Sequence, residues 1–246
     1  MRAAAALSIA VLLAGCAAFE PGPQNGRIAA FSGNAAGDAA PKGWQPLVIT
    51  RAKAPTEYRL IYDDGAGAVV VHARARRSAT GLMQALDVDP AERPRIAWRW
   101  RVQELIVGAD NLDRHAEDSP VRLLLFFDGD KRRLPARDQV ALDLAQMVSG
   151  QDVPYATLVY LWENRQPVGT VIASAHTGRV KMVVAGSGRD RLGQWKQFER
   201  DYVADFERAF GERPGRLVGV GIMTDTDNTG AESEAYYGDI ELLAAS

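Results

Sequence analysis

The sequence predicts an all-β protein, an antiparallel β-sandwich of jelly-roll type with one or two short helical insertions. Short runs of strand-forming residues recur along most of the chain. They are separated by turn chemistry such as Asp63-Asp64-Gly65, a strong hairpin signal. Only two segments show helical spacing in place of strand alternation. Strands at short intervals with few helices are typical of two-layer sandwiches.

The strand candidates differ in how deeply we expect them to be buried. Ile96–Val102 alternates strictly, so its two tryptophans should share one face and its two arginines the other. Val121–Phe127 is more continuously apolar, as in a strand that is buried on both faces. The other candidates are Trp44–Thr50, Tyr58–Tyr62, Ala68–Ala75, Leu158–Trp162, Val168–Ala173, Val180–Val184, Leu217–Met223 and Ala235–Leu243.

Two segments are predicted to be helices. Ala136–Val148 places four apolar side chains at helical spacing, and Gly150 follows as a stop signal. These side chains are Val140, Leu144, Met147 and Val148. In Asp201–Phe210, aromatic side chains recur at helical spacing, and Gly211 closes the run.

The chain length and the balance of charged residues limit the domain organisation and the partners that we expect. With 246 residues, the chain can form one sandwich, and we expect residues 27–246 to be a single domain. The 29 Lys and Arg residues nearly balance the 31 Asp and Glu residues. No global positive field therefore favours nucleic acid, and we expect no nucleic-acid partner.

The N-terminus resembles a bacterial lipoprotein signal peptide over residues 1–15. An apolar run too short to span a membrane ends in Leu13-Ala14-Gly15-Cys16, which resembles a lipobox. The resemblance implies cleavage before Cys16 and acylation of this sole cysteine, with residues 16–26 as a flexible tether. No acidic residue follows Cys16 directly, which favours the outer membrane, with the protein facing the periplasm. An ordinary signal peptide with a chance cysteine is the alternative interpretation.

Several motifs along the chain resemble one bacterial exported family. Trp98-Arg99-Trp100-Arg101-Val102 is followed by Glu117-Asp118-Ser119-Pro120-Val121-Arg122, by the acidic run 223–230, and by Tyr236-Tyr237-Gly238-Asp239-Ile240. Together they resemble domain of unknown function 3047, a family without an assigned activity. The last two strands also resemble the closing segment of galactose-binding-like jelly rolls, which are often carbohydrate-binding modules.

The loop Thr224–Glu232 is the first candidate site. Asp225, Asp227 and Asn228 offer hard oxygen ligands, which suit Ca²⁺. The spacing matches half of an EF-hand loop, but Tyr236 stands where that loop needs a bidentate Glu. A structural calcium held by Asp225 and Asp227, with Asp239 or Glu232 completing the site, is one interpretation. Asx-type turn capping is the other, and it is favoured.

Arg122 lies on a strand that we expect to be buried, so it needs a carboxylate partner. Asp118, Asp225 or Asp239 could supply that carboxylate, and a structural ion pair is favoured over a ligand clamp. Trp162 and the other tryptophans could stack on sugars, although aromatic residues at strand spacing mostly form core. The candidate ligand-binding residues are Asp118, Arg122, Trp162, Asp225, Asp227, Asn228 and Tyr237.

These observations favour a lipid-anchored module that binds a glycan or another cell-envelope ligand. A polysaccharide hydrolase or lyase with paired carboxylates and a structural lipoprotein are the alternatives. No catalytic residue can be assigned, because the three histidines lack metal-ligand spacing and the chain has no nucleophile elbow or phosphate loop.

Overall fold

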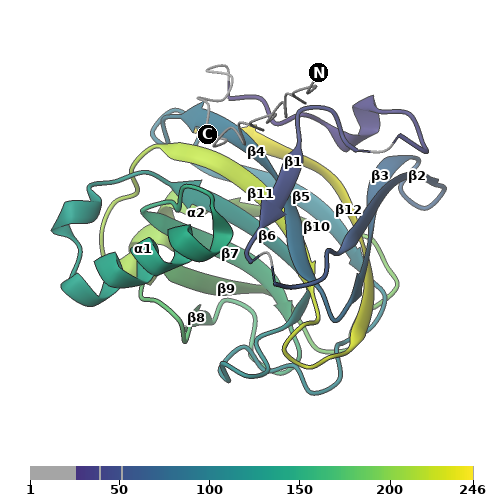
Figure 1. The fold of residues 1–246 in the computed structure, drawn as a ribbon. Coiled ribbons are helices and arrows are strands. Elements are labelled where there is room, and N and C mark those ends of the chain that lie inside the picture. Colours follow the sequence, from purple (N-terminus) through teal and green to yellow (C-terminus); the bar gives the residue numbers. More distant parts are fainter. Residues whose placement is uncertain (1–25, 39, 51, 246) are drawn as a thin grey trace, which may run out of the picture.

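The chain folds into a β-sandwich of jelly-roll type, with two sheets packed face to face (Figure 1). The computed structural model describes residues 26–38, 40–50 and 52–245. The expected signal peptide, Cys16 and nearly all of the tether lie outside the described residues. None of the described helices is long and apolar enough to cross a membrane.

The seven-stranded sheet has the order β1-β4-β11-β6-β7-β9-β8, and the five-stranded sheet has the order β10-β5-β12-β3-β2. The strands of the first sheet are β1 Gln45–Val48, β4 Ala79–Val88, β6 Ser119–Phe127, β7 Ala156–Glu163, β8 Val171–Ala173, β9 Val180–Ser187 and β11 Leu217–Asp225. Those of the second are β2 Glu57–Asp63, β3 Ala68–Arg76, β5 Arg95–Val102, β10 Lys196–Asp201 and β12 Glu232–Leu243.

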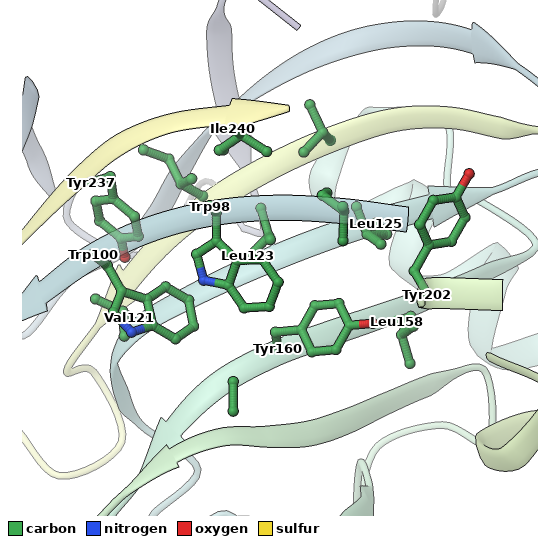
Figure 2. Close-up of a cluster of buried hydrophobic side chains, with 14 of the residues drawn as sticks. Trp98, Trp100, Val121, Leu123, Leu125, Leu158, Tyr160, Tyr202, Tyr237 and Ile240 are labelled. Carbon is green, nitrogen blue, oxygen red and sulfur yellow. The ribbon is translucent and has the colours of Figure 1, made fainter. Parts of the chain in front are cut away.

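Alternation along β6 shows which side chains face the core between the two sheets and which face outward. Val121, Leu123, Leu125 and Phe127 point into the main core, which residues of both sheets fill. Figure 2 shows the first three of them. Leu124 and Phe126 belong to a second apolar cluster built from the seven-stranded sheet alone. Because successive side chains of a strand point to opposite faces, this cluster covers the outer face of that sheet. Arg122 shares this outer face.

The tryptophans confirm the expectation that most are core residues. Trp98 and Trp100 are 2% and 0% exposed and face the main core, while Arg99 and Arg101 lie on the other face of β5. Figure 2 shows these two indoles beside Tyr160 and Tyr237. Strict alternation in the sequence therefore predicted the orientation of β5 correctly.

Both predicted helices are present. The helix α1 spans Ala136–Ser149, and the helix α2 spans Tyr202–Phe210. Gly150 ends α1 with φ of 69°, a left-handed conformation that glycine adopts without steric cost. Two short 3₁₀ turns, η1 Phe31–Gly33 and η2 Lys131–Arg133, complete the helical elements of the described chain.

Three features differ from the expectation. β4 was missed because its ten residues are nearly all buried and show no alternation. β10 was missed because this edge strand is mostly polar. The β7–β9 pair is parallel, whereas an antiparallel sandwich was predicted. The short strand β8, antiparallel to β9 at the sheet edge, lies between them in sequence and makes this connection feasible.

Candidate functional site

The candidate site forms where β11 ends beside the start of β6. These strands are antiparallel neighbours, and Asp225 is paired with Ser119 in the register. The acidic loop therefore lies directly over the first residues of β6. This pairing brings together two motifs that are about 100 residues apart in sequence.

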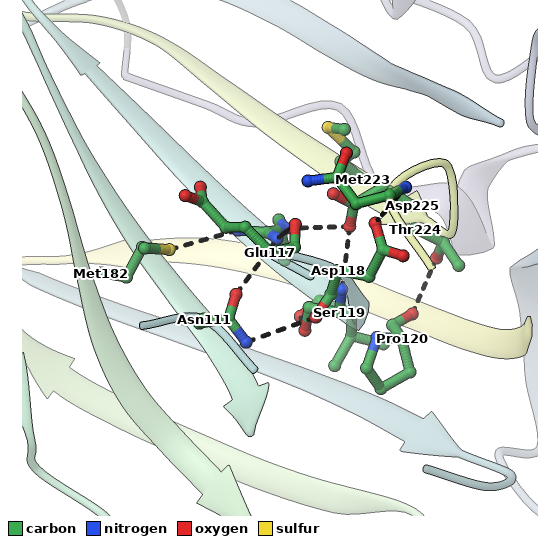
Figure 3. A network of polar contacts seen from close by, with 12 residues as sticks. Asn111, Glu117, Asp118, Ser119, Pro120, Met182, Met223, Thr224 and Asp225 are labelled. Carbon is green, nitrogen blue, oxygen red and sulfur yellow. Dashed lines mark hydrogen bonds and ion pairs between the residues drawn. The ribbon is translucent and has the colours of Figure 1, made fainter. Parts of the chain in front are cut away.

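Arg122 and Asp225 form a buried ion pair at the centre of the site. Figure 3 shows Asp225 close to Asp118 and Ser119. The Arg122 Nε donates to a carboxylate oxygen of Asp225 over 2.9 Å, and the two residues are only 6% and 5% exposed. The same carboxylate oxygen accepts the Ser119 amide at 3.1 Å. The prediction that a loop aspartate partners Arg122 is confirmed, and the partner is Asp225 rather than Asp118.

The rest of the Arg122 guanidinium is largely satisfied. Nη2 donates to Asn111 Oδ1 at 3.2 Å and to the Glu117 carbonyl at 2.9 Å. Nη1 points at the Met182 sulfur at 3.3 Å, which is a weak acceptor. Four of the five N–H groups therefore have acceptors among the described residues, and one N–H of Nη1 retains donor capacity.

Asp118 anchors the acidic loop. Its carboxylate accepts the Asn228 amide at 3.2 Å, the Thr229 amide at 2.7 Å and the Thr229 hydroxyl at 2.6 Å. The residue is 1% exposed, so these bonds replace the water that an isolated carboxylate would need. The loop's own Asp and Asn side chains were expected to cap their own turn, and this expectation was wrong, because Asp118 from outside the loop accepts these bonds. Asp225 and Asp227 pair with Arg122 and Lys53 instead.

Burial raises the pKa of Asp225 above its ordinary value, although the Arg122 guanidinium opposes this change. The neighbouring charge of Asp118 adds to the increase. A buried carboxylate stays ionised only when cations and amides compensate the lost hydration. The ion pair is therefore sensitive to the loss of either partner.

The acidic cluster that could hold calcium contains cationic side chains as well as carboxylates. Carboxylate oxygens of Asp118, Asp225 and Asp227 lie within 4.8 Å of one another, which is a suitable spacing for a hard cation. However, Arg122 pairs with Asp225, and the Lys53 ammonium pairs with Asp227. These side chains already place two positive charges at the cluster, so the residues present fit a calcium ion poorly. Asp239 is not part of the cluster, because its carboxylate accepts the amide and hydroxyl of Ser32.

A cleft of about 340 Å³ opens on the outer face of the seven-stranded sheet. Leu124, Phe126, Val159 and Met223 form its apolar floor. Ala145 and Ser149 of α1 line one wall. The polar end is formed by Lys53, Glu117, Arg122, Asp225, Asp227 and Asn228. An apolar surface with a few convergent polar groups is the usual form of a ligand site.

Three candidate residues do not line this cleft: Asp118 is 1% exposed and anchors the acidic loop, and Trp162 and Tyr237 lie in the main core. Trp162 is 2% exposed, faces the main core and donates its indole N–H to the Gly188 carbonyl. Tyr237 is also buried in the main core, where its hydroxyl contacts Thr224 and the Met223 carbonyl. Neither can contact a ligand in the cleft. Alternation places both on the inner face of their strands, so the sequence offered a signal against them.

Sequence reasoning missed three polar groups of the site. Lys53 lies in the 49–56 connection, and Asn111 and Glu117 lie in the long 103–118 segment. Neither segment has a periodic pattern, so no sequence signal places its side chains. A buried arginine has five N–H donors, which all need acceptors. The sequence alone therefore implied that Arg122 needs more partners than one aspartate.

Comparison with known families gives one clear match. The family described as protein of unknown function DUF3047 matches residues 42–241. The chain belongs to this family. The resemblance inferred from the motifs is therefore confirmed, and it covers β1 to β11 in full. Among curated proteins, none matches this DUF3047 member.

Three solved structures that are similar to this DUF3047 chain share at most 12% identity with it. The K2 cleaved adhesin domain of Lys-gingipain has a TM-score of 0.39, at 12% identity over 86% of this chain and 95% of that one. A beta-1,2-glucanase from Parabacteroides distasonis has a TM-score of 0.41, at 12% identity over 92% of this chain and 26% of that one. The xyloglucanase domain of NopAA from Sinorhizobium fredii, in complex with cellobiose, has a TM-score of 0.42, at 7% identity over 84% of this chain and 96% of that one.

Proposed function

We propose that this protein is a non-catalytic module that binds a neutral glycan in the cleft on the outer face of the seven-stranded sheet. The observation that carries the proposal is the cleft itself, in which an apolar floor ends at a fixed set of charged donors and acceptors. A sugar ring has the same two-sided character, because its C–H faces are apolar and its hydroxyl groups are polar.

The charges at the polar end favour a neutral ligand. Lys53 and Arg122 supply two positive charges, while Glu117, Asp225 and Asp227 supply three negative ones and the buried Asp118 beside them a fourth. An excess of negative charge repels phosphate and carboxylate ligands. A hydroxyl group both donates and accepts, so it can take the remaining Arg122 N–H while donating to a carboxylate. Charge-assisted hydrogen bonds of this kind are stronger than neutral ones.

Binding fits this geometry better than hydrolysis does. Asp118 is held by three donors, and Asp225 by Arg122 and Ser119, so both carboxylates already have fixed partners. A general acid needs a proton and freedom to deliver it to the substrate. We further propose that acylated Cys16 holds the module at the outer membrane, where it faces the periplasm and its glycans; this part rests on the N-terminal sequence.

A glycan array followed by titration calorimetry tests the proposal. The full chain carrying Cys16→Ser should bind at least one neutral oligosaccharide. Val180→Trp, which fills the cleft, and Asp227→Asn, which removes an acceptor at its polar end, should each weaken that binding about tenfold or more. Tyr62→Trp, on the exposed edge of the other sheet, is the matched control and should bind normally. Binding that Val180→Trp leaves intact would place the ligand elsewhere, and an array without any neutral glycan hit would refute the proposal.

A further inference from the structure

The helix α1 carries exposed apolar side chains along one side. Val140, Leu144, Met147 and Val148 are each more than half exposed, and Met147 reaches 78%. They recur at the spacing that places residues on a single helix face. We call these four residues the α1 stripe. The sequence predicted a helix with these four apolar residues at helical spacing, and the structure shows that they face solvent.

The sandwich is covered by the other side of α1. Asp138, Leu142 and Ser149 are the buried residues of the helix, and the Asp138 carboxylate accepts the Gly178 amide at 3.2 Å. Val140 and Leu144 each follow a buried position by two residues, which is about 200° of helical rotation. The α1 stripe therefore points away from the body of the protein. Four apolar side chains at one solvent-facing site need a partner surface.

Positive charge accompanies the stripe. Arg137 precedes Val140 by three residues and so lies on the same face. Arg133, in the preceding turn η2, is also exposed, and neither arginine forms an ion pair with a described carboxylate. Lys131 and Arg132 are paired with Asp152 and Asp130. Arg137 thus places a positive charge at the edge of the apolar face, which is typical of helices that lie in the interface of an anionic bilayer.

The described chain begins at the same end of the sandwich as η2. Asp87 lines one pocket together with Gly26 and another together with Lys131. Nine residues lie between Cys16 and Gly26, and the ten residue steps from one to the other span at most about 33–36 Å when extended. A lipid on Cys16 would therefore keep η2 and α1 within reach of the membrane surface.

We propose that the α1 stripe, with Arg133 and Arg137, docks on the surface of a bilayer that contains anionic phospholipid. The occupant is a lipid surface rather than a second copy of the chain, because four side chains on one helix cover far less area than a stable protein interface buries. The proposal does not depend on what the cleft binds.

A fluorescent probe on α1 tests the docking. In the full chain with Cys16→Ser, Met147→Cys is labelled with an environment-sensitive fluorophore and mixed with vesicles of phosphatidylglycerol and phosphatidylethanolamine. The emission should rise and shift to the blue. Tyr62→Cys, at an apolar side chain exposed at 59% on the edge strand of the other sheet, is the matched control and should not respond.

Further variants measure how much single side chains contribute to vesicle binding. Leu144→Ser should weaken the vesicle response about tenfold, and Arg133→Gln and Arg137→Gln should weaken it about fivefold each. Asp143→Asn, which removes an acid beside the stripe, should strengthen the response. A probe at position 147 that stays in water while the chain sediments with vesicles would overturn the proposal. So would a shift that appears without vesicles and grows with protein concentration, or an equal response to phosphatidylcholine alone.

Discussion

Replacing Arg122 with methionine should destabilise the protein far more than the loss of one ordinary contact. Arg122→Met leaves the Asp225 carboxylate buried, with Asp118 and Asp227 close by and no guanidinium to balance it. Removing one partner of a buried ion pair costs about 3–5 kcal/mol of unfolding free energy. For a domain of this size, that corresponds to a decrease of about 6–20 °C in Tm.

The size of this loss should depend on pH. Without Arg122, the pKa of Asp225 should rise further above its ordinary value, because burial and the Asp118 charge then act unopposed. A group whose folded-state pKa is raised contributes its full stability below its unfolded-state pKa and loses it as the pH rises through the folded-state pKa. The deficit of Arg122→Met should therefore be smaller at pH 5 than at pH 8.

Urea and thermal unfolding, followed by circular dichroism at both pH values, measure the effect. Arg132→Gln, which removes an exposed arginine paired with Asp130, is the control and should leave the midpoint unchanged. Arg122→Met/Asp225→Asn should recover part of the loss, because the double variant leaves no buried charge at the pair. If Arg122→Met unfolds at the same midpoint as Arg132→Gln at pH 8, our account of the site as a compensated buried charge pair is wrong.

Three further outcomes follow from the structure. Although burial alone would raise it, the pKa of Asp63 is lowered by hydrogen bonds from Trp195 and the Ala66 amide and by Arg101. Its stabilisation is therefore complete above the unfolded-state value of about 3.9 and is lost as the pH falls through the lower folded-state value. Asp63→Asn should flatten this part of the acid-unfolding curve. Gly186→Ala would place a methyl group 2.2 Å from the Trp162 ring, so it should lower Tm and change the tryptophan fluorescence. Lys53→Met removes the cation that pairs with Asp227, so calcium should raise the Tm of this variant and leave the wild-type Tm unchanged.

The sequence predicted the sandwich because its strongest patterns reflect burial that repeats along a strand. Alternation in β5 identified an inner and an outer face, and the apolar run of β6 identified a strand covered on both faces. The same reasoning required a carboxylate for Arg122. It could not choose Asp225 over Asp118, because that choice depends on the register between β11 and β6.

The features that were missed depend on contacts distant in sequence. The direction of the α1 stripe follows from where the helix docks, since Leu142 and Asp138 reach the sandwich and Leu144 does not. The helical spacing of the apolar residues is the same for either orientation. The cleft likewise depends on which loops flank the outer face, and the 103–118 segment has no periodicity from which that position could be read.

Two tyrosine hydroxyls in the core connect the sheets at the end that carries the site. Tyr237 of the five-stranded sheet donates to the Met223 carbonyl at 2.6 Å and contacts the Thr224 hydroxyl at 2.8 Å. Tyr58 of the same sheet accepts the Thr224 amide and donates to the Thr80 carbonyl. Strand β11 cannot detach near Asp225 without exposing both phenols and breaking these bonds. In native-state hydrogen exchange, the Thr224 amide should therefore be released only with global unfolding, so the acidic loop is attached to one of the last parts of the protein to open.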